Sequence, residues 1–104
     1  MTDNTATART TRRVFKYPID PEAALNPSGV KISMPVGAEI VHVNAQNGQA
    51  TMWAEVPDLD HDVSYNRIFH MVPTGGQIPG SWHALYLGTV HIDWTVWHIY
   101  EGVR

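Results

Sequence analysis

A β-hairpin signal lies in the middle of the chain and constrains its fold more than any other stretch. Two runs that alternate polar and apolar residues, 38–46 and 49–56, are joined by Asn47-Gly48. A type I′ turn needs positive φ at both central residues, which Asn and Gly tolerate best. The turn therefore predicts the register as well as the hairpin. That register pairs Gln46 with Gln49, Asn44 with Thr51, His42 with Trp53 and Ile40 with Glu55.

The two faces of this hairpin differ in character, because side chains of a strand point alternately to opposite faces. One face is apolar and is expected to be buried. It carries Val41, Val43, Ala45, Ala50, Met52, Ala54 and Val56. The other face collects His42 and Trp53 among polar residues.

Shorter signals predict the remaining elements. A strand over 14–17 carries an aromatic face, and Asp20 caps a short helix that Pro21 opens and Asn26-Pro27 ends. Further strands are expected over 31–34 and 67–72, and a second hairpin over 85–101 turns at Asp93-Trp94.

In the second hairpin, Ile92 is expected opposite Thr95. One face then carries Tyr86, Val90, Ile92, Trp97 and Ile99, while the other carries Leu87, Thr89, His91, Val96, His98 and Tyr100. Both faces are partly apolar, so this hairpin is expected to be central and covered on each side. The fold class that follows is mainly β: a small antiparallel barrel or sandwich of six to seven strands with one short helix, or a curved sheet that the helix plugs.

Length and charge set the organisation. The 104 residues suffice for one domain. Four of the seven basic residues lie in the first sixteen positions, so we expect a flexible basic arm over 1–12 and a single acidic β-rich domain over 13–104. An acidic domain disfavours nucleic acid as a partner.

The charged fraction of 16% and the exposed sheet edges favour a homo-oligomer. The absence of cysteine and of any apolar run of membrane-span or signal-peptide length favours a cytoplasmic protein.

Motifs for chemistry are weak. The histidines show neither His-x-His nor His-x-x-x-His spacing, so we expect half-buried structural histidines and no metal site. Asp58-x-Asp60-x-Asp62 begins like a calcium loop but continues with Val63 where the turn glycine belongs. No serine lies in a Gly-x-Ser-x-Gly elbow. The sequence thus predicts no catalytic residue, no cofactor and no enzyme.

Binding is the remaining possibility. The polar hairpin face offers a flat amphipathic surface with an indole, which suits a partner protein or a planar ligand. The long Gly/Pro loop over 73–81 could present backbone N–H groups to an anion, although an ordinary turn is the simpler interpretation. The candidate ligand- or partner-binding residues are His42, Trp53, Asn44, Thr51, Thr74, Gly75 and Gly76.

Several sequence blocks resemble a small family of unknown function that is encoded by bacteriophages and prophages. The matching blocks are Met34-Pro35-Val36-Gly37-Ala38, Gln46-Asn47-Gly48, Thr74-Gly75, Leu87-Gly88-Thr89 and Trp97-His98-Ile99-Tyr100-Glu101. The chain departs from the pattern at Pro73-Thr74-Gly75-Gly76, where the family has Gly-Thr-Gly-His. The resemblance implies an accessory gene product that works in the host cytoplasm, and it transfers no catalytic residue.

Two functions follow as expectations. The first is a non-enzymatic phage accessory protein that binds a host or phage macromolecule, in host takeover or counter-defence. The alternative is a binder of small molecules or nucleotide-like signals that acts by sequestration at His42, Trp53 and the Gly-rich loop. A minor virion component ranks behind both.

Overall fold

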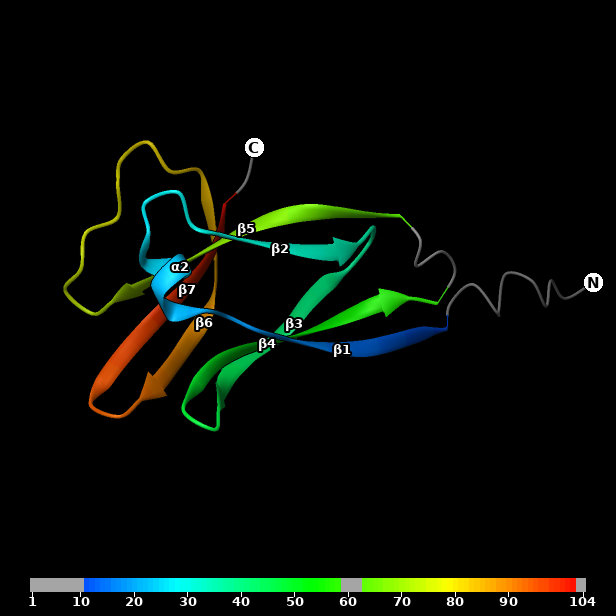
Figure 1. The fold of residues 1–104 in the computed structure, drawn as a ribbon, viewed down its shortest axis with the longest axis horizontal. Helices are drawn as coiled ribbons and strands as arrows, with labels where there is room; N and C mark the ends of the chain where they lie inside the picture. The colour runs from blue at the N-terminus through cyan, green and yellow to red at the C-terminus, as the bar shows by residue number, and fades with distance from the viewer. Residues whose placement is uncertain (1–10, 59–62, 103–104) are drawn as a thin grey trace, which may run out of the picture.

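The computed structural model describes residues 11–58 and 63–102. Within these residues, seven strands form two antiparallel sheets and one short helix accompanies them (Figure 1). Sheet A has the order β1-β4-β3, and sheet B has the order β2-β5-β7-β6. The elements are β1 (Arg12–Pro18), α2 (Pro21–Leu25), β2 (Val30–Pro35), β3 (Glu39–Gln46), β4 (Gln49–Pro57), β5 (Ser64–Pro73), β6 (Ala84–Ile92) and β7 (Thr95–Gly102).

The mainly β prediction is confirmed, and the architecture is that of a sandwich. Strands β3 and β6 lie against each other where the two sheets meet, but they belong to different sheets. A Cβ atom added to Gly88 of β6 would overlap with Cγ2 of Val43 in β3. The Val43 side chain therefore packs over the face of β6 at Gly88, and the two strands stay in separate sheets, so the described strands do not close into a barrel.

The central hairpin forms as predicted around its turn. Asn47 and Gly48 have φ values of 53° and 75°, and His42 lies opposite Trp53. The prediction fails at the far end, where Ile40 pairs with Ala54 and not with Glu55. A bulge at Val41 causes this shift, because the extra residue moves every earlier side chain to the other face. Val41 is therefore 48% exposed and does not join the core.

The predicted faces of the last hairpin are wrong at its open end, because β6 contains a second bulge. Ile92 lies opposite Thr95 as expected, but the register shifts between Tyr86 and Gly88. Tyr86 consequently lies opposite Tyr100 on the outer face, and Leu87 packs against the core. The predicted central position holds for β7 alone, since β6 is the edge strand of sheet B.

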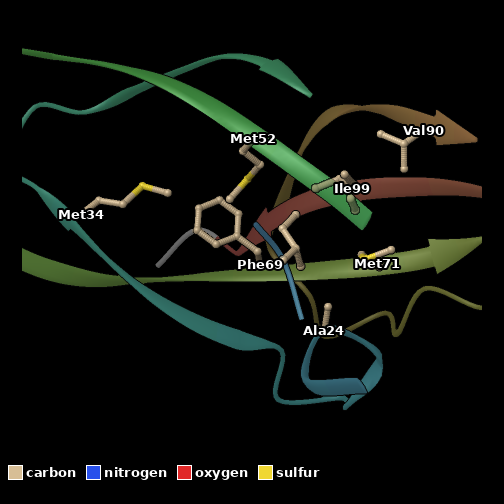
Figure 2. Close-up of a cluster of buried hydrophobic side chains, with 9 residues drawn as sticks. Ala24, Met34, Met52, Phe69, Met71, Val90 and Ile99 are labelled. Atoms are coloured by element: carbon tan, nitrogen blue, oxygen red, sulfur yellow. The ribbon is translucent and has the colours of Figure 1, made fainter. Parts of the chain in front are cut away.

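The core lies between the two sheets and is closed at one side by α2. Phe69 of β5 lies at its centre, with Met52 of sheet A and Ile99 of sheet B beside it (Figure 2). Each of these three side chains is completely buried. Burying one large apolar side chain stabilises a fold by about 1.5–3 kcal/mol, so this cluster is the main source of stability.

Helix α2 matches its prediction. Asp20 is the N-cap residue, its carboxylate accepts a hydrogen bond from the Glu22 amide at 3.1 Å, and Asn26 is the C-cap. Ala24 faces the core. None of the helices in the described residues is long and apolar enough to cross a membrane.

Candidate functional site

The outer face of sheet A carries the predicted aromatic surface. Lys16, Trp53 and His42 stand side by side on β1, β4 and β3, because Trp53 is the register partner of both neighbours. Val14 lies one pair further along β1, is 61% exposed and stands opposite Glu55. We call the surface formed by Val14, Lys16, His42, Asn44 and Trp53 the Trp53 face.

The indole at the centre of the Trp53 face is supported by its histidine neighbour. The ring centroids of His42 and Trp53 are 5.6 Å apart, and the ring planes meet at 43°. His42 is exposed and Trp53 is half-buried. The pair therefore presents a rigid amphipathic platform of the kind that anchors protein interfaces.

Polar groups surround this platform. Lys16 donates a hydrogen bond from Nζ to Oε1 of Gln46 at 2.9 Å. At the other end of the sheet, the Arg12 guanidinium lies 3.1 Å from the Glu55 carboxylate and 3.7 Å from that of Glu39. An apolar centre with a polar rim is the usual anatomy of a protein–protein interface.

Two predicted residues on this sheet have different surroundings. Thr51 is only 2% exposed, and its hydroxyl donates to the Gln49 carbonyl at 3.0 Å, so it supports the sheet and cannot contact a partner. Asn44 is exposed, and its side-chain oxygen accepts a hydrogen bond from the Ala45 amide at 2.8 Å. Of the predicted residues on the hairpin, His42, Trp53 and Asn44 are therefore the ones on the surface.

The Gly-rich loop lies on sheet B, away from the Trp53 face (Figure 1). The Gly76 amide donates to the Pro73 carbonyl at 2.8 Å, and Gly75 has a φ of 87°, which together make a type II turn. The Thr74 amide donates to the Val96 carbonyl at 3.0 Å. Two of the three amides proposed for anion binding thus have partners within the protein, and the predicted residues do not form one common site.

A polar chain on the outer face of sheet B was not predicted. The two ring nitrogens of His98 lie 2.8 Å from the Thr74 hydroxyl and 3.0 Å from the Thr89 hydroxyl. Thr89 in turn is hydrogen-bonded to the Tyr86 hydroxyl. The bulge at Leu87 brings Tyr86 to this face, and no sequence pattern marks that bulge. This series of hydrogen bonds links Thr74 of the Gly-rich loop to β6 and β7.

His70 is the second unpredicted feature of sheet B. Its ring stacks on Trp82 at a centroid distance of 3.8 Å, and only 5% of the residue is exposed. Burial lowers the pKa of His70 below its ordinary value, so the ring is neutral at pH 7. Nδ1 of His70 is buried without a hydrogen-bond partner in the described residues. Trp82 thereby fastens the far end of the Gly-rich loop onto β5.

The family comparison covers almost the whole chain. A model described as DUF7352, a domain of unknown function, matches residues 10–104. The chain belongs to the DUF7352 family. No curated protein and no solved structure matches it. The prediction of a domain of unknown function is thereby confirmed, while the phage origin stays a prediction.

Metal chemistry has little support in this DUF7352 chain. The described residues contain no group of three His, Asp or Glu side chains that could hold a metal ion. Asp60 and Asp62 of the predicted acidic loop lie outside the described residues. The Trp53 face combines the His42–Trp53 ring pair with exposed polar side chains and a rim of paired charges.

Proposed function

We propose that this DUF7352 protein is a non-enzymatic interaction module that binds a partner protein through the Trp53 face. The observation that carries the proposal is a half-buried indole at the centre of a sheet face that neither the helix nor the Gly-rich loop covers. Aromatic residues in such positions are the usual anchors of protein interfaces.

The chemistry of the rim indicates the kind of partner. Lys16 lies beside the indole on β1, and the ion pairs of Arg12 with Glu55 and Glu39 lie toward one end of the sheet. A partner therefore needs a flat apolar centre with charges of both signs around it. A second copy of the chain has these properties, and so can a folded host or phage protein.

The biological setting forms part of the proposal. The matching sequence blocks suggest an accessory product of a bacteriophage or prophage, acting in the host cytoplasm in host takeover or counter-defence. A partner in that compartment would be modulated by occupancy of its surface, with no bond made or broken.

The alternative of a nucleotide-like ligand held jointly by His42, Trp53 and the Gly-rich loop has weaker support. The two halves of that site lie on different sheets, and two of the three loop amides already donate within the protein. The Trp53 face alone therefore carries the proposal.

The test compares two tryptophan variants in affinity capture from bacterial lysate. Trp53→Ala removes the anchor of the Trp53 face, whereas Trp94→Ala removes an indole that is 100% exposed at the β6–β7 turn. Both variants should fold, as checked by circular dichroism. Proteins captured by the wild type and by Trp94→Ala should be absent with Trp53→Ala.

A purified partner identified in this way should then bind the wild type at least about tenfold more tightly than Trp53→Ala, since an interfacial anchor contributes about 2 kcal/mol or more. Equal capture by the wild type and Trp53→Ala would show that the Trp53 face is not the interface.

A further inference from the structure

A cavity of about 410 Å³ opens between the tips of the two hairpins. Gly48 and Gln49 line it from the β3–β4 turn, and Asp93 and Thr95 line it from the β6–β7 turn. The two turns point toward the same end of the molecule (Figure 1). The cavity is separate from the Trp53 face, since none of the five residues of that face lines it.

The inner wall of the cavity is apolar. Met71 of β5 and Ala50 of β4 come from the buried core, and Ile92 and Trp97 pack against that core. Concave sites of roughly 300–1,000 Å³ with mostly apolar walls and a few polar groups are typical for small organic ligands. A flat ring of one or two cycles fits this volume and can stack on the Trp97 indole.

The rim of the cavity carries one acidic side chain and two neutral polar side chains. Asp93 supplies a carboxylate and Thr95 a hydroxyl. Gln49 donates from its amide nitrogen to the Ile19 carbonyl at 3.2 Å, which leaves its amide oxygen as an acceptor. Neither Lys nor Arg is among the residues that line the cavity. The rim therefore favours a donor or a positive charge and disfavours an anion.

Asp93 has a φ of 53°, the same value as Asn47 in the other hairpin, so its left-handed backbone belongs to the tight β6–β7 turn. Asp93 is the only charged residue among the described residues that line the cavity, and the chain beyond residue 16 has nine carboxylates but only three basic side chains. A net negative charge attracts cations to the protein as a whole.

We propose that the cavity between the hairpin turns is a binding site for a small organic cation, an amine with an aromatic or branched apolar body. The body lies against Trp97, Met71 and Ile92, and the ammonium group faces Asp93 and the oxygens of Gln49 and Thr95. Aromatic rings also attract ammonium groups, which strengthens the preference when Trp97 is near the charge. This proposal is independent of the Trp53 face.

Three probes with the same phenyl body separate the effects of charge and shape. Phenethylamine carries an ammonium group, 2-phenylethanol a hydroxyl group and phenylacetate a carboxylate. Titration of the ¹⁵N-labelled full-length protein, followed by amide chemical shifts, reports both affinity and place. We expect phenethylamine to shift the amides of Asp93, Thr95 and Trp97, and to bind at least about tenfold more tightly than phenylacetate.

A charge-only variant tests the role of Asp93. Asp93→Asn removes the charge while keeping a residue that tolerates the left-handed conformation, so the turn is preserved. Its affinity for phenethylamine should fall about tenfold, and its affinity for 2-phenylethanol should not change. Glu39→Gln is the matched control: it removes one negative charge from a side chain that is 70% exposed and lies outside the cavity lining, and it should leave both affinities unchanged.

Each other outcome contradicts the proposal. If none of the three probes shifts amides at the cavity, the site does not bind small ligands of this size. If phenylacetate binds as tightly as phenethylamine, or Asp93→Asn binds phenethylamine like the wild type, the cation preference is wrong. The capture experiment with Trp53→Ala is unaffected by either result, so the two proposals can fail separately.

Discussion

At the scale of single residues, Gly29 lies in close contact with β5 beneath the His70–Trp82 stack. Gly29 has a φ of 75°, and a Cβ atom placed on it would lie 2.7 Å from Cε1 of His70 and 2.8 Å from the Phe69 carbonyl oxygen. Only glycine meets both demands, namely the left-handed backbone and the missing side chain. The turn before β2 can therefore pack directly against β5.

Gly29→Ala should destabilise the protein more than Gly48→Ala does. Gly48 has the same φ of 75° but has no atom within 4 Å of its added Cβ, so it isolates the cost of the backbone conformation. We expect about 1 kcal/mol for Gly48→Ala and at least about 2–3 kcal/mol for Gly29→Ala, measured as the free energy of unfolding in urea.

The difference between these two variants is the cost of relieving the close contacts with His70, Ile68 and the Phe69 carbonyl. A ring shift should also change the fluorescence of Trp82, which stacks on that ring. Equal destabilisation by both variants would mean that β5 moves away from Gly29 without cost.

At the scale of elements, the two β-bulges explain where sequence-based prediction stops. Asn47-Gly48 determines its hairpin locally, so the pairing of His42 with Trp53 and the aromatic face could be predicted. The bulges at Val41 and Leu87 lie in β3 and β6, the two strands that meet between the sheets. Bulges bend and twist a strand, and their place depends on the partner sheet rather than on local propensity.

The candidate site, too, could be predicted only in part, because burial and sheet order are not encoded in the alternation of residues. Alternation placed Trp53 and Thr51 on one face, but it contains no information on which of them a neighbouring strand buries. The separation of the Gly-rich loop from the hairpin likewise depends on sheet order, which is a tertiary property. The cavity between the turns needs both hairpins in place, so neither sequence signal alone could reveal it.

One arginine of sheet B reaches the segment that leads into sheet A. The Arg67 guanidinium on β5 donates two hydrogen bonds to the Glu101 carboxylate on β7, at 2.6 and 2.7 Å, and a third to the Ala38 carbonyl before β3, at 2.6 Å. The side chains of Arg67 and Glu101 are only 11% and 14% exposed. The hydrogen bonds to Glu101 raise the pKa of Arg67, so the guanidinium stays charged.

Arg67→Lys should lower the free energy of unfolding by about 2 kcal/mol, because an ammonium group cannot reproduce the planar two-bond contact and also reach Ala38. Hydrogen exchange should rise at the start of β3, where the contact to Ala38 is lost. Arg13→Lys is the matched control. It alters an exposed pair with Asp58 at 2.8 Å and should leave stability unchanged. Equal effects of both substitutions would show that Arg67 does not hold the segment that leads into sheet A.

At the scale of the whole molecule, the charges around the Trp53 face suggest how two copies would associate. A two-fold axis parallel to β4 places β1 of one copy over β3 of the other, since these strands flank β4. Arg12 of one copy then lies near Glu39 of its partner, and the two Trp53 side chains meet at the centre.

We therefore expect a face-to-face dimer of the 11.6 kDa chain. Light scattering at increasing protein concentration should give twice the chain mass for the wild type and for Trp94→Ala, but the mass of one chain for Trp53→Ala. High salt should weaken the dimer only partly, because salt screens the exposed rim and leaves the apolar contact intact. A wild-type mass of one chain at every concentration would exclude this dimer. The Trp53 face would then be open in solution, so only a different protein could be its partner, and affinity capture would be the experiment that identifies it.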